Sequence, residues 1–242
     1  MAKAPKTAYV CNDCGAEFSR WQGQCSACKA WNTISEVRLI SASNSTKNDR
    51  FSGYAGETRA KIQTLSEISL QETPRFTSGF KELDRVLGGG IVPGSAILIG
   101  GHPGAGKSTL LLQVMCGLAK NMTALYVTGE ESLQQVAMRA NRLNLPTDKL
   151  NMLSETSVEQ ICNLADQLKP QIIVVDSIQV MHLSDIQSSP GSVAQVRECA
   201  SFLTRYAKTR QVAIIMVGHV TKDGTLAGPK VLEHAIDLSL IH

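Results

Sequence analysis

The chain has 242 residues, of which 43% are apolar and 19% charged, and its formal net charge is +3. Residues 1–60 hold eight Lys and Arg against five Asp and Glu, and the remaining sixteen of each sign cancel, so charge alone gives no case for nucleic-acid binding. No run approaches the ~18 apolar residues of a membrane span, and the N-terminus lacks the apolar region of a secretory signal. We therefore expect a cytoplasmic protein with one full-sized globular domain and a small additional module.

Four cysteines lie near the N-terminus, in the pattern Cys11-x2-Cys14-x10-Cys25-x2-Cys28. Each pair can present two thiolates to one ion, and four thiolates form a closed tetrahedral zinc site with no open position. A redox dithiol would need one pair rather than two. The spacing therefore predicts a C4 zinc finger over residues 9–36, which binds Zn²⁺ and depends on it to fold.

Both tryptophans of the chain, Trp21 and Trp31, lie in this module. A module of this size has few other apolar side chains, so we expect the two indoles to form its small core. The alternative is that they stack on nucleic-acid bases. The other three cysteines are scattered singly on expected helices, and we expect them to be buried small apolar residues; they are Cys116, Cys162 and Cys199.

Residues 37–63 follow the module and are expected to form a linker. Most of this segment is rich in Ser, Asn, Gly and charged residues and has few large apolar ones. It cannot bury enough surface to offset the entropy lost on ordering. The second domain is therefore expected to begin at residue 64.

Apolar strands alternate with amphipathic helices over residues 64–242. Two of the helices begin with potential capping boxes, Thr156 with Glu159 and Ser192 with Gln195. This alternation predicts βαβ units and an α/β domain whose mainly parallel sheet is covered on both faces. The chain stops at or inside its last expected strand, which we interpret as a domain that is incomplete at its C-terminus. We expect strands at 95–100, 123–128, 150–153, 172–176, 212–217 and 235–241, and helices at 107–121, 133–143, 157–168 and 192–208.

A glycine-rich loop lies between the first expected strand of this domain and its first helix. Its residues match the P-loop pattern G-x-x-x-x-G-K-[ST], in the strand–loop–helix context that the pattern requires. The backbone amides would surround the β-phosphate of ATP, Lys107 would reach the β- and γ-phosphates, and Ser108 would bind Mg²⁺. A chance glycine turn is the alternative. The expected nucleotide-binding residues are Gly101, His102, Pro103, Gly104, Ala105, Gly106, Lys107, Ser108 and Thr109.

Other chemistry-bearing residues follow later strands. Asp176 ends the strand IIVVD and is expected to hold Mg²⁺ through water, unless it only caps the strand. Glu130 is our candidate for the acid that orients the attacking water, with Glu131 in reserve. Both glutamates could instead favour the N-terminus of the next helix. His219 follows VAIIMVG and could sense the γ-phosphate, or could simply be a polar residue that leaves a strand.

Several stretches together resemble a known family. They are TSGFKELDRVLGGGIVPGSAILIGGHPGAGKST, VTGEES, IIVVDSIQ and VGHVTKDGTLAGPKVLEH, in that order after the four-cysteine module. The combination resembles the bacterial RadA (Sms) family of DNA-repair proteins over nearly the whole chain. The resemblance implies a RecA-like P-loop NTPase core at 64–242 behind the zinc module. It also implies a DNA-dependent ATPase that forms hexameric rings and processes recombination intermediates by branch migration.

By position, the resemblance assigns six of the loop residues to the phosphate loop, namely Gly101, Gly104, Gly106, Lys107, Ser108 and Thr109. It assigns Asp176 to the Walker B position and Glu130 to the water-orienting acid. Segments 177–191 and 220–230 correspond to DNA-facing loops, in which Lys222 and Lys230 would contact phosphates or remain solvated surface lysines. The implied partners are single-stranded and branched DNA, other copies of the chain in a homo-hexamer, and a recombinase or helicase.

The family continues with a Lys-Asn-Arg-Phe-Gly motif and a domain that resembles the Lon protease, and this chain has neither. We therefore expect the chain to bind nucleotide and DNA weakly and to turn over ATP poorly. Two other functions remain open. One is a KaiC-like RecA-fold ATPase that acts on protein partners, and the other is a binding module in which ATP is only a structural ligand.

Overall fold

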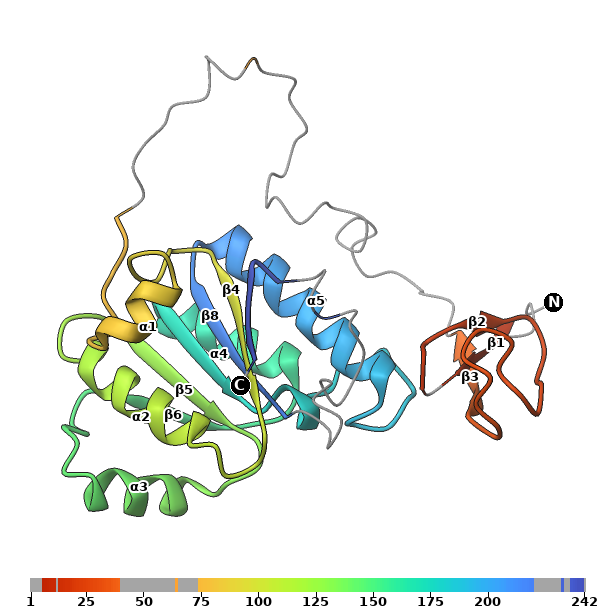
Figure 1. Cartoon of the computed structure of the whole chain (residues 1–242), viewed down its shortest axis with the longest axis horizontal. Helices are drawn as coiled ribbons and strands as arrows, with labels where there is room; N and C mark the ends of the chain where they lie inside the picture. Colours follow the sequence, from red (N-terminus) through yellow and green to blue (C-terminus); the bar gives the residue numbers. More distant parts are fainter. Residues whose placement is uncertain are drawn as a thin grey trace.

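The computed structural model describes residues 6–11, 13–39, 64, 74–219, 232 and 236–241. The described strands form two sheets, one of three strands and one of six (Figure 1). The three-stranded sheet is antiparallel, with β1 (Lys6–Cys11) between β2 (Glu17–Phe18) and β3 (Ile34–Leu39). The predicted linker, 37–63, falls mostly outside the described residues, so it stays a prediction.

The six-stranded sheet is parallel and has the order β6-β5-β7-β8-β4-β9. The strand that precedes the glycine-rich loop, β4, is therefore separated from β7 by β8. This order confirms the predicted α/β class with a RecA-like core. The strands are β4 (Ala96–Gly101), β5 (Ala124–Thr128), β6 (Asn151–Ser154), β7 (Ile172–Asp176), β8 (Ala213–His219) and β9 (Leu238–Ile241).

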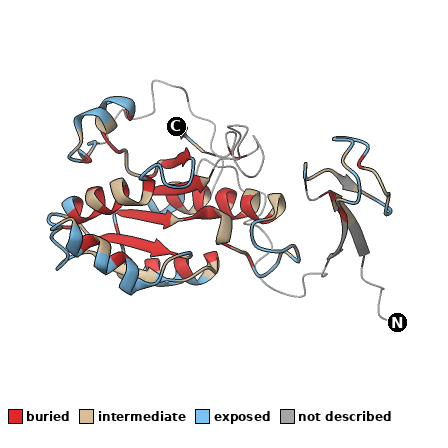
Figure 2. Ribbon diagram, turned by 60° about the horizontal axis from the view of Figure 1, so that its bottom comes forward, coloured by how far each residue is buried: buried red, intermediate tan, exposed pale blue. Residues whose placement is uncertain are grey.

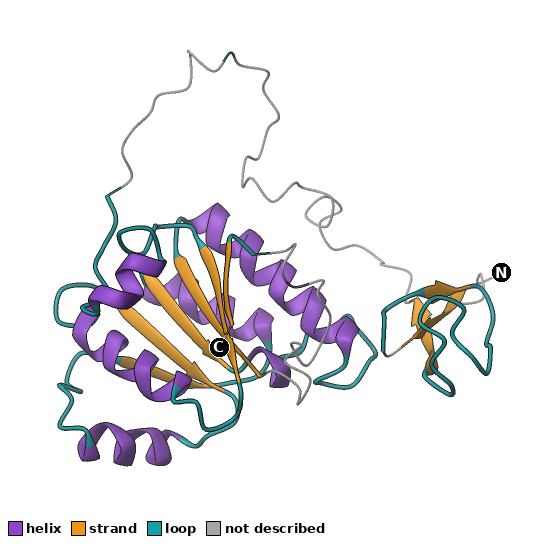
Figure 3. Ribbon diagram, viewed as in Figure 1, coloured by secondary structure: helices purple, strands orange, loops and turns teal. Residues whose placement is uncertain are grey.

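Helices cover both faces of this sheet (Figure 3). Side chains of α2 and α3 pack in one buried cluster, and those of α4 and α5 pack in the other. A short helix, α1, precedes β4, and the 3₁₀ helix η3 follows β7. The helices are α1 (Lys81–Val86), α2 (Lys107–Leu118), α3 (Leu133–Arg142), α4 (Val158–Leu168), η3 (Ile178–Val180) and α5 (Val193–Arg210).

Successive residues of the central strands enter opposite clusters. In β7, Ile172 and Val174 face the α2 side, whereas Ile173 and Val175 face the α4 side. All four side chains are buried, and Figure 2 shows strands of the sheet in the colour of buried residues. This is why the parallel strands read as continuous apolar runs in the sequence. The three scattered cysteines are also buried, as predicted; Cys116, Cys162 and Cys199 are 1%, 7% and 0% exposed.

The expected element boundaries hold to within a few residues, with two exceptions in detail. α4 is capped by Ser157, whose hydroxyl accepts from the amide of Gln160, so the predicted cap at Thr156 is wrong. Glu159 instead accepts from the amide of Ser184. α1, η3 and the three strands of the small sheet were not predicted. Among the described residues, no helix has the length and apolarity needed to cross a membrane.

Candidate nucleotide-binding and metal sites

Neighbouring strands bring the expected nucleotide-site residues to one edge of the sheet. β4 and β8 pair with Gly101 opposite His219, and β5 and β7 pair with Thr128 opposite Asp176. β7 also pairs with β8, so the four strand ends are contiguous. The carboxyl ends of parallel strands share an edge, and open α/β sheets bind ligands there.

The glycine-rich loop runs from the end of β4 to the start of α2. Gly104 and Gly106 have φ values of 83° and 86°, and a Cβ built at either would meet nothing within 4 Å. The left-handed backbone, not crowding, therefore requires glycine at both positions. Gly106 is also the N-cap of α2, whose free amides attract anions. Ser108 and Thr109 are half-buried in the first turn, whereas His102, Pro103 and Ala105 are exposed.

Lys107 is the first residue of α2 and is only 8% exposed. Its Nζ donates to the carbonyl oxygens of Gly101 and His102, at 2.7 and 2.9 Å. Burial lowers the pKa of Lys107, while the charges of Asp176 and Glu130 act in the opposite direction. The ammonium group therefore lies inside the loop and within electrostatic reach of both acids.

Asp176 is the last residue of β7, and its Oδ2 accepts a 2.6 Å hydrogen bond from the hydroxyl of Tyr126. Tyr126 comes from β5 and is 1% exposed. Burial and the charge of Asp176 raise the pKa of this phenol, so it acts as a hydrogen-bond donor that orients the carboxylate. Sequence reasoning missed this contact, which exists only because β5 and β7 are neighbours.

Glu130 lies in the loop that follows β5, and this loop passes very close to η3. The amide of Gly129 donates to the carbonyl oxygen of Asp176 at 2.8 Å. A Cβ at Gly129 would lie 2.6 Å from Val180 Cγ2 and 2.8 Å from Met181 Cε. A Cβ at this position would therefore require the side chains of Val180 and Met181 to move, and glycine lets the loop that carries Glu130 pack closely against them.

Two side chains contact the Glu130 carboxylate. The hydroxyl of Ser177 donates to Oε1, and Nε2 of His219 lies 3.3 and 3.4 Å from the two oxygens. The carbonyl oxygen of His219 accepts from Nε2 of Gln179 at 3.4 Å. Nδ1 of His219 is buried without a hydrogen-bond partner among the described residues. Sequence reasoning missed Ser177, for which the one available signal was its place directly after Asp176.

Glu131 has a different environment, although it is adjacent in sequence. Both of its carboxylate oxygens accept from the guanidinium of Arg139, on α3. Its backbone amide and carbonyl both bond the hydroxyl of Thr128, at 3.2 and 2.7 Å. The structure therefore places Glu131 in an ion pair with α3, and Glu130 beside Ser177 and His219. This geometry favours Glu130 over Glu131 as the water-orienting acid.

Residues 177–191 were predicted to form a DNA-facing loop. The side chain of Gln195, which is 2% exposed, holds the second half of this segment in place. This side chain accepts from the amide of Leu183 at 3.0 Å and donates to the carbonyl oxygens of Ile186 and Ser188, at 2.9 and 3.0 Å. These hydrogen bonds fix the backbone of the second half of segment 177–191, whatever that segment contacts.

The other predicted DNA-facing loop is segment 220–230. The two lysines named as phosphate contacts, Lys222 and Lys230, belong to it, and the segment lies outside the described residues. Their role therefore stays a prediction.

The four predicted zinc ligands converge in the small sheet. All four sulfur atoms lie within 4.8 Å of one another, with Cys11 and Cys28 3.7 Å apart and Cys14 and Cys25 3.5 Å apart. A tetrahedron of ~2.3 Å Zn–S bonds has sulfur–sulfur distances of about 3.8 Å, so the set fits zinc.

The backbone prepares both pairs of ligands in the same way. The amide of Gly15 donates to the carbonyl oxygen of Cys11 at 2.9 Å, and that of Lys29 donates to Cys25 at 2.8 Å. Gly15 and Lys29 both have positive φ, at 72° and 65°. Each C-x-x-C segment is therefore a tight turn that aims its two sulfur atoms at a common point.

The two tryptophans do not form the core of this module, so that prediction is wrong. Trp21 and Trp31 are 58% and 69% exposed, and the buried residues among those of the module that the structure describes are Cys11, Cys25 and Ile34. Two of the four zinc ligands, Cys11 and Cys25, therefore take the buried positions that were expected for the indoles. The edges of both rings lie near Gly23 on the surface. The alternative, stacking on bases, stays a prediction.

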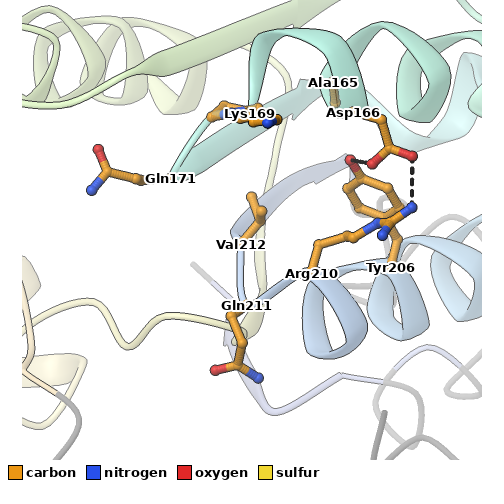
Figure 4. Close-up of a pocket in the computed structure, with 9 residues that line it drawn as sticks. Ala165, Asp166, Lys169, Gln171, Tyr206, Arg210, Gln211 and Val212 are labelled. Carbon is orange, nitrogen blue, oxygen red and sulfur yellow. Dashed lines mark hydrogen bonds and ion pairs between the residues drawn. The ribbon is translucent and has the colours of Figure 1, made fainter. Parts of the chain in front are cut away.

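A cavity of about 510 Å³ lies at the amino ends of β7 and β8, at the edge of the sheet opposite the P-loop (Figure 4). Asp166 closes part of it by accepting from the hydroxyl of Tyr206 at 2.9 Å and from Arg210 at 2.8 Å. Ligand sites of open α/β sheets lie at the opposite, carboxyl edge. The cavity therefore does not belong to the nucleotide site.

Comparison with known families gives two matches. A model described as "AAA domain" matches residues 62–225. The chain belongs to the AAA domain family. A second model, described as "Rubredoxin metal binding domain", matches residues 9–36. The AAA domain match covers the glycine-rich loop and all four strand ends of the site, and the second match covers the four cysteines.

This AAA domain protein is similar over its whole length to curated proteins named "DNA repair protein RadA". It is 93% identical over 241 residues to the one from Haemophilus influenzae, in an alignment that covers 100% of the chain and 52% of the relative. It is 72% identical over 242 residues to the one from Escherichia coli, in an alignment that covers 100% of the chain and 53% of the relative. The Bacillus subtilis protein is 46% identical over 241 residues, covering 99% of the chain and 52% of the relative. The chain thus spans about half the length of these relatives. The predicted resemblance to the RadA family is confirmed.

Proposed function

We propose that this chain carries the nucleotide-hydrolysing core of a DNA-dependent ATPase that acts in recombinational DNA repair. The observation that carries the proposal is the convergence of Lys107, Asp176, Glu130 and His219 at one edge of the sheet. The similarity to RadA proteins supports DNA repair as the process. A site of this kind on an AAA domain favours hydrolysis over a purely structural nucleotide.

The P-loop is proposed to bind ATP through its backbone. The amides of residues 101–106 and the N-terminus of α2 would surround the β-phosphate. Lys107 would exchange its two carbonyl partners for phosphate oxygens, which are stronger, charge-assisted acceptors. Thr109 is proposed to face the α-phosphate.

Two residues fit a magnesium ion. The Ser108 hydroxyl and the Asp176 carboxylate are oxygen donors of the kind that Mg²⁺ prefers, and Tyr126 orients Asp176. When bound, Mg²⁺ would neutralise charge on the β- and γ-phosphates. Asp176 is proposed to act through a metal-bound water.

Glu130 is proposed to orient the attacking water for in-line attack on the γ-phosphate. Its carboxylate would accept a hydrogen from that water and hold it in line with the leaving group, which is a positioning role. His219 contacts the same carboxylate from the end of β8, next to the P-loop strand. It is therefore proposed to respond to the γ-phosphate and to transmit the state of the site to the loop that follows it.

The substrates and partners belong to the whole protein and are proposed by similarity. We expect branch migration on single-stranded and branched DNA, through contacts at Lys222, Lys230 and segment 177–191. The chain would act in a homo-hexameric ring, in the cytoplasm, with a recombinase or helicase as a further partner. The zinc module would add a folded, metal-dependent contact surface.

The decisive experiment is ATP hydrolysis by the zinc-loaded chain with and without single-stranded DNA. Lys107→Ala is the test variant, and Lys120→Ala is its control, because Lys120 is exposed just beyond the opposite end of the same helix. We expect slow turnover that DNA stimulates only weakly, that K107A loses, and that K120A keeps.

Other outcomes separate the remaining functions. Turnover that is indifferent to DNA would replace the DNA motor with an ATPase that acts on protein partners, as KaiC-like proteins do. Nucleotide binding without turnover in any condition would contradict hydrolysis by this chain alone and would indicate that the site requires residues from outside it.

A further inference from the structure

The residue directly after Asp176 is a buried serine whose hydroxyl is engaged at the proposed catalytic edge. Ser177 is 0% exposed, and its hydroxyl donates to Oε1 of Glu130. The two residues are 47 positions apart in the chain, but they follow β7 and β5, which pair directly. Neighbouring strand ends therefore bring a neutral donor to the acid that is proposed to orient water.

We propose that Ser177 is a positioning residue for Glu130, an inference that rests on the proposed function. Its hydroxyl fixes one carboxylate oxygen, so that the other faces the position of the attacking water. Ser177 does not itself touch the nucleotide or the water. It acts by selecting one orientation of the Glu130 side chain.

The need for such a residue follows from the exposure of Glu130. Its side chain is 37% exposed and projects from a loop rather than from a strand. A free glutamate has three rotatable bonds, and ordering such a side chain costs about 1.5 to 2 kcal/mol of conformational entropy. Ser177, in contrast, is short and fully buried, so its hydroxyl is held rigidly. The rigid residue therefore orders the flexible one.

His219 contacts the same carboxylate but cannot replace this function. Its Nε2 is 3.3 and 3.4 Å from the two oxygens, so it approaches both weakly and selects neither. A serine hydroxyl donates to a single oxygen and keeps its proton throughout the physiological pH range. Oε1 is therefore the anchored oxygen, and Oε2 is the oxygen left to accept from water.

The test removes the hydroxyl alone. We expect Ser177→Ala to lower kcat by between about 10- and 100-fold, the loss typical of a displaced reacting group, with the KM for ATP changed less than about threefold. Ser177→Thr retains the donor and should recover part of the loss. The matched control is Thr204→Val, which removes a 1% exposed hydroxyl from α5, away from the site, and should leave kcat unchanged.

A double-mutant cycle separates positioning from general damage. In a Glu130→Gln background, S177A should cause little further loss of kcat, because the carboxylate that Ser177 positions is no longer present to orient the water. If S177A lowers kcat by the same factor in the wild-type background and in the E130Q background, Ser177 acts independently and the proposal is wrong. Wild-type kcat in S177A would also overturn it.

A structural readout keeps the test independent of turnover. Crystals of nucleotide-free wild type and S177A should show the Glu130 carboxylate in one orientation in the first and in several in the second, with the Cα trace unchanged. If S177A shows the single wild-type orientation, Ser177 does not position Glu130. The orientation of the Glu130 carboxylate can be compared even if the wild-type chain does not hydrolyse ATP. Absence of hydrolysis would contradict the proposed function, but it would leave the contact between Ser177 and Glu130 open to this test.

Discussion

The four-cysteine module and the six-stranded domain are stabilised by different interactions. The domain buries two extended apolar clusters, one on each face of its sheet. Among the residues of the module whose burial the structure describes, Cys11, Cys25 and Ile34 are buried, and two of these three are predicted metal ligands. Small units cannot remove enough apolar surface from water to fold alone, so we expect the module to depend on zinc for folding and the domain to depend on its packing.

The two regions also use their polar groups differently. The four sulfur atoms form a closed set, with each ligand directed at one point, as in a structural zinc site. In the domain, by contrast, Asp176 and Glu130 each have a carboxylate oxygen fixed by a donor from a neighbouring strand or strand end. Such carboxylates are oriented but remain able to bind a ligand, as a catalytic site requires.

Removal of zinc should have the largest effect on folding, and this effect should be confined to the module. A chelator is expected to unfold residues 9–36 completely, because metal binding in such modules supplies about 10 to 16 kcal/mol of folding free energy. Amide hydrogen exchange should show full loss of protection in β1 and β3, with no change in β4, β7 and β8. Simultaneous loss of protection in both regions would show that they fold as one unit and would break the comparison.

Within the domain, adjacent glutamates should behave differently. Glu130→Gln is expected to lower kcat by about 100-fold or more, because the neutral amide is a weaker hydrogen-bond acceptor for the attacking water than the carboxylate, while a non-hydrolysable ATP analogue still binds. Glu131→Gln breaks the contact with Arg139, so it should cost about 1 kcal/mol of stability and change kcat by less than about threefold. Single-turnover hydrolysis and thermal unfolding measure the two effects. The reverse ranking would assign the role to Glu131.

The strands of the six-stranded sheet, the four long helices and the phosphate loop could be predicted because each has a local signal. Buried strands are continuous apolar runs, and the loop needs glycine at Gly104 and Gly106 for its backbone. The contacts of Tyr126 and Ser177 could not be predicted, because they depend on which strands are neighbours. The identity of a helix cap was also ambiguous, since Thr156 and Ser157 are both suitable residues and the structure uses the second.

The interior of the module was mispredicted for a related reason. Apolar character suggested that Trp21 and Trp31 would be inside, but the buried side chains described there are those of Ile34 and two of the four ligands, Cys11 and Cys25. Where a metal replaces a core, hydrophobicity no longer indicates burial. The same reasoning explains why the scattered cysteines of the domain were predicted correctly, since there burial does follow apolar character.

Loss of one hydrogen bond to Asp176 should have an intermediate effect. Tyr126→Phe removes the donor that orients the carboxylate, and we expect the Mg²⁺ concentration for half-maximal binding of a fluorescent ATP analogue to rise about tenfold. Tyr206→Phe is the matched control, because its hydroxyl donates to Asp166 at the other edge of the sheet. An equal change in both variants would indicate general destabilisation, and no change in Y126F would show that Asp176 needs no partner.

The smallest effect is expected from the largest side chains of the module. Trp21→Ala and Trp31→Ala should each change the zinc affinity by less than about 0.5 kcal/mol, because both indoles are exposed. Ile34→Ala, in contrast, removes a side chain that is 7% exposed and should weaken zinc binding by about 2 kcal/mol, or roughly 30-fold. Competition with a chromophoric chelator measures all three, since zinc affinity includes the folding free energy of the module. If either tryptophan variant loses as much zinc affinity as I34A, that indole stabilises the fold of the module. If neither does, the two rings can be removed without a change in stability. The effect of both substitutions on the binding of single-stranded DNA can then be measured in the same variants.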